Sequence, residues 1–500
     1  MKKILLITTM IAFVICSCKK DITSLNVDTK DARKVPAEAL FANAQKNLSN
    51  LLASPNVNTN IFRLIVQQWT QTTYTDESNY NLKTRQIPDR LFQILYMDVL
   101  KNLQEAKSII ANDALKSADV KANQLAIADI MQVYAYHMLV NTFGNVPYTE
   151  ALNYTNITPK YDDAKTIELD LLKRLKDDVA TLNANSTASS YDGSDIIYGG
   201  NVAKWIKFGN TLMLKLAMLL ADVDNANTQT YVTAAVAPAT GGVFTSNSDN
   251  ALFGYMSATP NTNPLWVDLF QSGRADFVAS KTIVDMMNVL NDPRRPMYFA
   301  QAGGVYTGGE NGKKNDYSSF SAPSNLLSKN PTIASVFLDW SETAFLLSEA
   351  VARGISIVGA PTGIGGSDAQ AYYNAGVNAS IEYWYAIANA MGVANTSLAD
   401  ATNAYNIYIA TVAYTPLPAG GYKQKIGEQK YIALYNRGFD AWTEWRRLGY
   451  PALAKATNAL SEIPVRFTYP IKEQNLNGVN CSQAAAVIGG DVVTAKLFWK

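Results

Sequence analysis

Histidine and cysteine are scarce in this chain of 500 residues. It contains one histidine, His137, and three cysteines, Cys16, Cys18 and Cys481. The first two cysteines fall in a targeting segment, described below, which leaves one. Zinc fingers, HExxH proteases, CxxC redox sites and disulfide scaffolds are excluded, because each needs more histidines or cysteines than this chain supplies. We therefore expect no metal site and no cofactor.

An excess of charge of one sign is also lacking. The chain has 43 Lys and Arg against 42 Asp and Glu, so its formal net charge is +1. A basic stripe for nucleic acid would disturb this balance, and we expect no nucleic-acid partner. Hydrophobic residues make up 48% of the chain and charged residues 17%, which is typical of a folded protein. The 27 tyrosines and 8 tryptophans suit a protein that binds its ligand by stacking.

The N-terminal segment is a targeting signal. Two lysines precede an apolar run over residues 4–15, which is too short to cross ~30 Å of hydrocarbon but fits the core of a signal peptide. The small Ser17 directly precedes Cys18, as in a bacterial lipobox, whereas Cys16 follows a bulky isoleucine. We expect cleavage before Cys18 and a lipid on its side chain. The alternative is an ordinary signal peptide in which Cys18 has no role.

Most of the mature chain has helical periodicity. Proline at positions 36 and 88 favours helix starts, and Gly144 favours a helix end. The predicted helices cover residues 37–53, 89–112, 121–144, 163–183, 200–222, 280–290, 341–353, 369–391 and 424–436. Between about 240 and 335, Gly, Asn, Ser, Thr and Tyr dominate, which predicts long loops of the kind that often carry function.

Pairs of helices with alternating small and bulky residues resemble tetratricopeptide-type hairpins. The pair formed by 342–354 and 368–384 is the clearest example. We therefore predict a mainly α fold, a tetratricopeptide-like scaffold of helical hairpins with a long loop-rich region packed on it. The predicted domains are a lipoprotein signal peptide (1–17), the lipidated cysteine with a tether (18–35) and a single helical domain (36–500).

Motifs typical of catalysis are incomplete. The glycine-rich run from Gly363 has Asp368 where a dinucleotide fingerprint needs its third glycine, so we expect Ser367 or Asp368 to cap the next helix instead. A P-loop-like segment has lysine rather than Ser or Thr after Lys313, and an EF-hand-like start at 222–227 lacks the sixth-position glycine. With His137 expected in the core or at an interface, nothing here indicates an enzyme.

The segment from Gln424 to Leu453 is the most specific in the chain. An amphipathic helix precedes a break at Gly438, and a second short helix carries Trp442, Trp445 and two arginines, Arg446 and Arg447, which we expect to be structural. The run QKYIALYNRGFDAWTEWRRLGYP resembles the C-terminal signature of the SusD/RagB family, nutrient-binding outer-membrane lipoproteins of Bacteroidetes. Further segments fit the SusD-like branch in the expected order, at 276–299, 306–321, 342–354 and 463–477.

The resemblance implies a helical domain with four tetratricopeptide-like hairpins, anchored by lipid to the outer membrane and facing the cell surface. It also implies a partner, a SusC-like TonB-dependent barrel, to which the protein passes captured oligosaccharides without chemistry. Other possibilities are a peptide-binding member of the family, a lid with little ligand affinity by itself, and a lipid-anchored glycan hydrolase.

Two clusters mix aromatic rings with polar side chains, as sugar recognition requires. One follows the first helix, in QQWTQTTYTDESNY, and the other lies in the middle loops, where Asn315, Tyr317 and Phe320 belong to it. The candidate ligand-binding residues are Trp69, Tyr74, Asp76, Asn79, Tyr80, Trp266, Arg274 and Tyr306. The competing interpretation places the two tryptophans in the core, because large aromatic side chains are usually buried.

Overall fold

Helices dominate the computed structural model, which describes residues 35–362 and 367–500. The predicted lipidation site at Cys18, the signal peptide and almost all of the tether lie outside these residues. Residues Ala37–Lys500 group together as one unit, and the description below concerns that unit. The prediction of a mainly α fold is confirmed.

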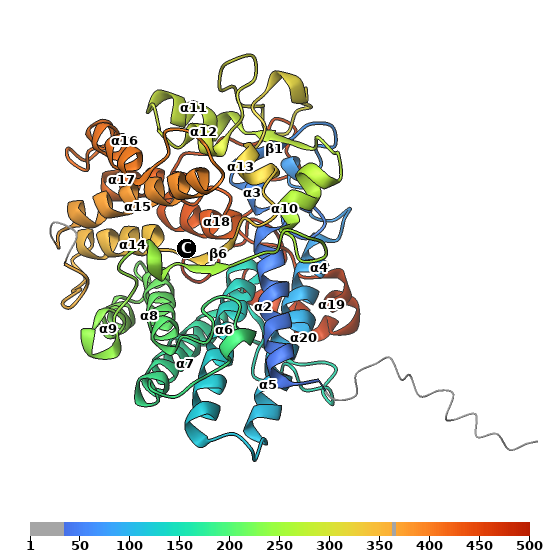
Figure 1. Ribbon diagram of the computed structural model, residues 1–500. Helices are drawn as coiled ribbons and strands as arrows, with labels where there is room; N and C mark the ends of the chain where they lie inside the picture. The colour runs from blue at the N-terminus through green and yellow to red at the C-terminus, as the bar shows by residue number, and fades with distance from the viewer. Residues whose placement is uncertain (1–34, 363–366) are drawn as a thin grey trace, which may run out of the picture. The chain divides into compact units, whose positions relative to one another are not determined.

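The first half of this unit is a series of helices that pack on their neighbours in sequence. α5 packs on α6, α6 on α7, α7 on α8 and α8 on α9, while α2 packs on α5 (Figure 1). Their bounds are α2 Ala37–Ala53, α4 Ile87–Gln93, α5 Lys101–Ala111, α6 Ala118–Phe143, α7 Ala164–Ala184, α8 Val202–Leu219 and α9 Asn225–Val236. A π-helical segment, Ile94–Leu100, joins α4 to α5. Gly144 ends α6 with a positive φ of 86°, as its position in the sequence predicts.

A second group of helices comes from the C-terminal half. α14 packs on α15 and α17, α15 on α16, and α17 on α18, which confirms the predicted hairpin of α14 and α15. The bounds are α14 Trp340–Ala352, α15 Ala369–Ala390, α16 Leu398–Thr411, α17 Gly421–Ala433 and α18 Gly438–Leu448. Asp368 caps α15 as expected, since its carboxylate accepts a 2.7 Å hydrogen bond from the amide of Ala371.

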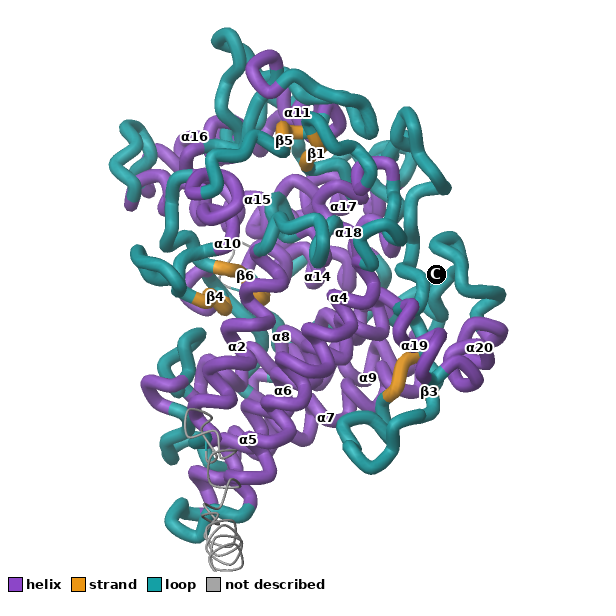
Figure 2. The backbone as a smooth tube through the Cα atoms, turned by 90° about the vertical axis from the view of Figure 1, so that its right-hand side faces the viewer, coloured by secondary structure: helices purple, strands orange, loops and turns teal. Residues whose placement is uncertain are grey.

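Short elements fill the loop-rich middle and the connections. The short helices include α3 Phe62–Ile65, α10 Pro264–Trp266, α11 Lys281–Val289, α12 Arg295–Tyr298, α13 Asn325–Ser328, α19 Ile471–Leu476 and α20 Gly478–Val487. The strands of the described residues form three antiparallel pairs, β1 Trp69–Gln71 with β5 Phe277–Ala279, β2 Val146–Pro147 with β3 Tyr161–Asp162, and β4 Ala251–Phe253 with β6 Ser335–Leu338. Figure 2 shows the β1–β5 pair beside α11, among the loops of the middle region.

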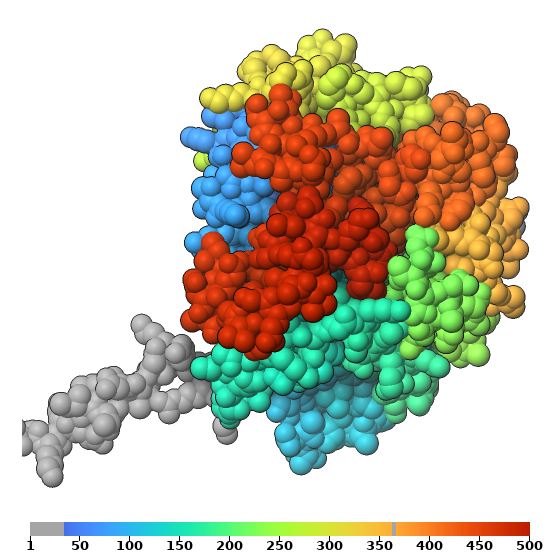
Figure 3. All heavy atoms as spheres, turned by 180° about the vertical axis from the view of Figure 1, so that it is seen from behind, coloured from blue at the N-terminus to red at the C-terminus, as the bar shows by residue number. Residues whose placement is uncertain are grey.

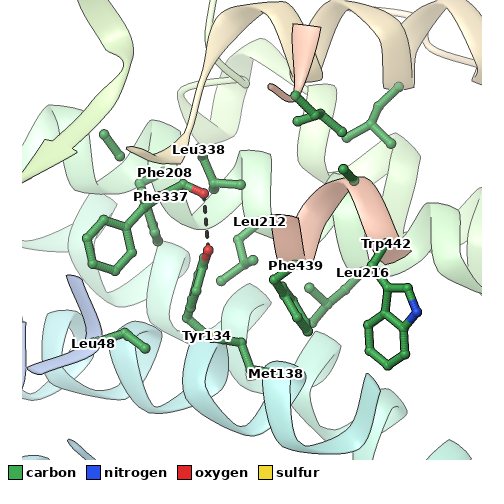
Figure 4. Close-up of a cluster of buried hydrophobic side chains, with 14 of the residues drawn as sticks. Leu48, Tyr134, Met138, Phe208, Leu212, Leu216, Phe337, Leu338, Phe439 and Trp442 are labelled. Carbon is green, nitrogen blue, oxygen red and sulfur yellow. Dashed lines mark hydrogen bonds between the residues drawn. The ribbon is translucent and has the colours of Figure 1, made fainter. Parts of the chain in front are cut away.

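The core joins the two groups of helices. Figure 4 shows buried side chains from α6, α8, β6 and α18 in one cluster. Tyr134 of α6 donates a 3.2 Å hydrogen bond from its hydroxyl to the backbone oxygen of Phe337 in β6. Trp442 of α18 is fully buried and donates its indole N–H to the backbone oxygen of Pro464. Trp442 is therefore structural, as the sequence indicated.

Buried ion pairs attach α18 to the other helices. Asp440 of α18 lies 2.5 Å from the ammonium of Lys215 in α8, and Lys215 lies 2.9 Å from Glu342 in α14. Arg437 also contacts Glu342, at 2.5 Å. Burial alone raises the pKa of Glu342, but Lys215 and Arg437 outweigh burial and lower it. Glu342 is therefore charged, and both carboxylates are paired with cations inside the protein.

The two arginines of the C-terminal signature have different partners. Arg447 forms ion pairs with Glu349 of α14 and Glu444 of α18, while Arg446 donates to the backbone oxygens of Asn141 and Val465 at 2.7 and 2.9 Å. These bonds attach α18 to α6 and α14, in agreement with the structural role expected for the two arginines. In Figure 3 the atoms of the C-terminal residues, coloured red, lie against atoms coloured cyan and green from the first half of the chain.

Among the helices of the described residues, those not predicted from the sequence are α9, α16, α19, α20 and the short α3, α10, α12 and α13. The EF-hand-like start at 222–227 is instead the beginning of α9, where Asp224 accepts a hydrogen bond from the amide of Asn227. α16 begins with a capping box formed by Ser397 and Asp400, a signal that the sequence analysis missed. In the described part of the chain, none of the helices has the length and apolar content needed to cross a bilayer.

Candidate ligand-binding site

The β1–β5 pair brings together two segments that are about 200 residues apart in sequence. Gln71, the last residue of β1, lies opposite Phe277, the first residue of β5. The loop that follows β1, which we call the early loop, therefore starts beside the segment of the middle region that enters β5. Thr72 extends the pairing, because its amide donates to the oxygen of Asp276 at 2.9 Å and its hydroxyl to that of Ala275 at 2.7 Å. The two clusters predicted separately from the sequence are therefore neighbours.

A third segment, around residues 306–320, is held against the same two. The side-chain amide of Asn315 donates a 2.9 Å hydrogen bond to the backbone oxygen of Gln71, and its backbone amide donates to that of Thr72. Asn79 of the early loop donates to the oxygen of Gly312 at 2.8 Å. Gly312 has a φ of +77°, and a Cβ there would lie 2.1 Å from Asn79 Oδ1, so both the turn and the close approach require glycine.

A cleft of about 280 Å³ opens beside these segments. Its exposed rings are Phe270 and Tyr317, of which 49% and 42% of the surface is accessible. Its lining also contains charged and polar groups, Arg274, Asp276, Asn325, Ser328 and Lys329. We call this cleft, with the adjacent loop residues Tyr74 and Asp76, the candidate site.

Local sequence explains how the two rings are presented. Asn263 caps α10 by accepting from the amide of Leu265 and donating to the oxygen of Ile333, both at 2.7 Å, and a π-helical turn then carries Phe270. Tyr317 begins a short 3-10 turn whose following hydroxyls, on Ser318 and Ser319, donate to the carboxylate of Asp316. Each ring therefore projects from a turn that is fixed by a capping side chain.

The polar side of the candidate site is a surface ion pair. The guanidinium of Arg274 donates two hydrogen bonds to Asp276, at 2.5 and 2.9 Å, and both side chains remain partly exposed. The pKa of Arg274 is raised, first by this hydrogen bond and also by the nearby Tyr74. Rings that stack on the C–H face of a sugar, beside donors and acceptors for its hydroxyls, are the groups that saccharide binding needs.

Tyr74 and Asp76 are exposed, in agreement with a role at the rim of the site. Tyr74 is 60% accessible, and both residues belong to the loop that Thr72 attaches to β5. Trp266 is half-buried, with its ring 6.1 Å from that of Phe270, so it supports this ring from outside the cleft lining. Of the eight residues predicted from the sequence, only Arg274 lines the cleft itself.

Trp69 is in the core instead. Its ring is 1% accessible, packs 5.7 Å from the ring of Phe277, and donates its indole N–H to the hydroxyl of Tyr435 at 2.9 Å. The guanidinium of Arg63 covers it at 5.2 Å. A ring enclosed on these sides has no face left for a ligand, so we do not retain Trp69 in the candidate site.

Three further predicted residues also have structural contacts. Asn79 is buried, and Tyr80 is 4% accessible, with its hydroxyl accepting a hydrogen bond from the amide of Ala456. Tyr306 is half-buried under the guanidinium of Arg295, 5.6 Å from its ring, and does not line the cleft. Asn79 and Tyr80 hold the early loop in place from its buried side. An amide and an aromatic ring in this structural role have the same residue types as a binding cluster, so sequence alone did not distinguish the two.

The sequence analysis missed Phe270, Asp276, Asn325 and Lys329. A signal for Phe270 was available, because it follows Trp266 by four residues and so shares one face of a helical turn with it. No such signal existed for Asn325 and Lys329, since only the folded chain brings them to the cleft. In the described ranges, no cluster of three or more His, Cys, Asp or Glu side chains has the arrangement of a metal site.

Comparison with known proteins gives one family. A SusD-like family model, described as starch-binding and associating with the outer membrane, matches residues 29–470. No curated protein sequence matches the chain.

Solved structures agree with this match. A chitin-binding protein is 26% identical, with a TM-score of 0.78 over 93% of this chain and 99% of its own. A SusD homologue from Bacteroides uniformis is also 26% identical, with a TM-score of 0.75 over 92% and 99% of the two chains. A chitin-binding SusD homologue from Flavobacterium johnsoniae is 22% identical, with a TM-score of 0.76 over 93% and 98%.

Proposed function

The chain belongs to the SusD-like family, and from this premise we propose that it is an outer-membrane nutrient-binding protein that captures oligosaccharides. The candidate site carries this proposal, because Phe270 and Tyr317 expose rings beside the Arg274–Asp276 pair. The solved chitin-binding protein, which matches over almost the whole of both chains, supports a glycan with N-acetylglucosamine units as the first ligand to test.

Binding without chemistry is part of the proposal. An enzyme that cleaves glycosidic bonds needs an acid and a base placed on either side of the bond. The carboxylate in the lining of the cleft, Asp276, is already engaged in an ion pair with Arg274. Incubation of the protein with chitin and starch oligosaccharides would reveal a hydrolase by the appearance of shortened products.

The direct test is titration calorimetry with chitohexaose and maltohexaose. We expect affinity in the micromolar range or weaker, near −8 kcal/mol or less favourable, because a captured nutrient must also be released. Phe270→Ala and Tyr317→Ala should each weaken binding several-fold, since a well-placed stacking contact contributes about 0.5–1.5 kcal/mol.

A control is Tyr306→Ala, which removes a half-buried tyrosine of the same region that lies outside the cleft. If this variant weakens binding as much as Tyr317→Ala, or if neither cleft variant changes it, the candidate site is wrong. Binding of peptides in place of both oligosaccharides would favour the peptide-binding alternative.

The setting of this activity is also a proposal. A lipid on Cys18 would anchor the protein to the outer membrane, facing the cell surface. The ligand would pass to a SusC-like TonB-dependent barrel, for which the protein would act as a lid. The support is the family match, together with the lipobox pattern at residues 15–18.

A further inference from the structure

A second cleft lies along α15 and shares no residue with the candidate site. Its volume is about 540 Å³, and Trp340 of α14 and Tyr405 of α16 border it. These three helices lie side by side in Figure 1, at the left of the molecule. We call this cleft the α15 groove. Its lining is mainly polar, unlike the packed faces of the other helical pairs.

Four polar side chains line the α15 groove at a constant spacing. They are Gln370, Asn374, Asn378 and Glu382, each four residues after the last. A helix rises 1.5 Å per residue, so neighbouring members are about 6 Å apart along the axis. An extended polypeptide repeats every two residues, or about 6.6 Å. Successive members of the row therefore match successive backbone groups on one edge of an extended chain.

Small residues directly after three members of this row leave room for a peptide backbone to approach the helix. Ala371, Ala375 and Ala379 also line it, and each presents only a methyl group. Side-chain amides such as those of Asn374 and Asn378 carry both a donor and an acceptor, which is what a peptide group needs from its partner. The combination suits main-chain recognition, in which hydrogen bonds to the backbone supply the affinity.

The row has unused hydrogen-bonding capacity. The oxygen Oδ1 of Asn374 is buried and has no partner among the residues described. Buried polar groups of folded proteins are nearly always paired, so this oxygen gains a partner when the side chain turns toward a ligand in the groove. Asn378 donates only within the row, to Glu382 at 2.9 Å, and Gln370 only accepts a long 3.4 Å contact from Thr415.

Charge and shape select the class of ligand. The charged residues of the lining are Asp368 and Glu382, and no lysine or arginine is among them, so the groove attracts cations. Trp340 is only 5% accessible and Tyr405 is half-buried, so the groove lacks the exposed rings on which a sugar stacks. These features favour a basic peptide over an oligosaccharide.

We propose that the α15 groove binds an extended, basic polypeptide segment. Asn374 and Asn378 pair with its backbone, while Asp368 and Glu382 bind its lysine or arginine side chains. The row from Gln370 to Glu382 is about 18 Å long and accommodates five or six extended residues. This site is separate from the glycan-binding proposal, and either proposal can fail without the other.

The test uses the purified full chain and a fluorescent nine-residue peptide of alternating threonine and lysine. Fluorescence anisotropy should show saturable binding. A second peptide with the same sequence, N-methylated at every other residue, keeps all its charges but loses backbone donors, and it should bind at least tenfold more weakly. The double variant Asn374→Ala, Asn378→Ala should lose a similar factor for the unmodified peptide.

Asn389→Ala is the matched control, because Asn389 is an exposed asparagine of α15 outside the groove, and its removal should leave binding unchanged. Three results would overturn the proposal: no saturable binding, equal binding of the N-methylated peptide, or displacement of the peptide by chitohexaose. The comparison of the two peptides uses the unaltered protein and decides the question even if the double variant does not fold.

Discussion

The side-chain amide of Asn315 donates a hydrogen bond of 2.9 Å to the backbone oxygen of Gln71, across 244 residues of sequence. The same amide nitrogen also contacts the oxygens of Glu310 and Lys313, and Asn315 Oδ1 accepts from the amide of Glu310. One buried side chain therefore fixes the loop that carries Tyr317 against the strand that precedes Tyr74.

Asn315→Ala should lower the free energy of unfolding by about 1–3 kcal/mol, because it leaves buried backbone groups without partners. It should also weaken oligosaccharide binding although Asn315 does not line the cleft. Urea denaturation and calorimetry measure the two effects. Asn406→Ala, at an exposed position of α16, should change neither. Unchanged stability of the Asn315 variant would contradict its role in holding the loop.

Trp69→Ala and Tyr74→Ala should behave in opposite ways. The first removes a buried ring and should cost about 3–5 kcal/mol of stability, whereas the second should leave stability unchanged within error, since Tyr74 is exposed. Tyr74→Ala should reduce oligosaccharide affinity if the early loop forms the rim of the site. Thermal unfolding followed by circular dichroism separates them, and a stable Trp69 variant would refute the core assignment.

The buried carboxylates make stability depend on acid pH. Burial raises the pKa of Glu444, but Arg447 and Lys430 outweigh it and hold that pKa at about 2. A carboxyl whose pKa is lower in the folded state contributes stability above its unfolded value, near 4.3, and loses it as the pH falls toward 2. Urea denaturation at several pH values should show stability falling through this window.

Arg447→Met should destabilise the protein by about 3–5 kcal/mol at pH 7, because it leaves Glu349 and Glu444 buried with one cation fewer. The deficit should shrink between pH 7 and pH 4. Without the arginine, burial raises the pKa of these carboxyls, so they take up protons at a higher pH and the variant is relieved of buried charge as the pH falls. The parent protein loses stability over the lower part of the same range, so the difference between the two proteins decreases. A deficit that stays constant with pH would mean that packing, not charge, explains the effect.

Cys18→Ala should release the protein from the membrane fraction, and Cys16→Ala should not, because the lipobox pattern places the lipid on Cys18. Fractionation after labelling with a fatty-acid analogue measures both. If the Cys18 variant remains acylated and membrane-bound, the prediction of lipidation is wrong.

Mild-detergent purification from native membranes should recover a much larger barrel protein with this chain. The prediction rests on the family match and on the proposed role as a lid. Recovery of the chain alone, under conditions that preserve related complexes, would count against it.

Local signals explain why most helices could be predicted from the sequence. Gly144 ends α6 and Asp368 caps α15 through their own backbone or side-chain chemistry, and each does so where expected. α20 was missed because its apolar residues Val479 and Val487 remain exposed, so its sequence lacks the periodicity of a buried face.

The candidate site was harder to predict because it depends on pairing between distant segments. β1 has three residues, Trp69–Gln71, too few to show strand alternation, and its partner is far along the chain. Composition alone could not separate Asn79, which is buried and bonds to Gly312, from Asp76, which is exposed three residues earlier. The sequence therefore predicted which segments contribute to the site. Which of their side chains are buried supports and which are exposed could be determined only from the folded structure.

The position of α18 has a consequence for biosynthesis. Lys215 and Glu349 are synthesised long before Asp440 and Arg447, and until then each of them lacks one of its buried partners. A nascent chain that lacks α18 cannot bury them at acceptable cost, so it stays open. For a chain that is exported unfolded, as the proposed signal peptide implies, a core that closes only with its last tenth or so keeps it competent for translocation until synthesis is nearly complete.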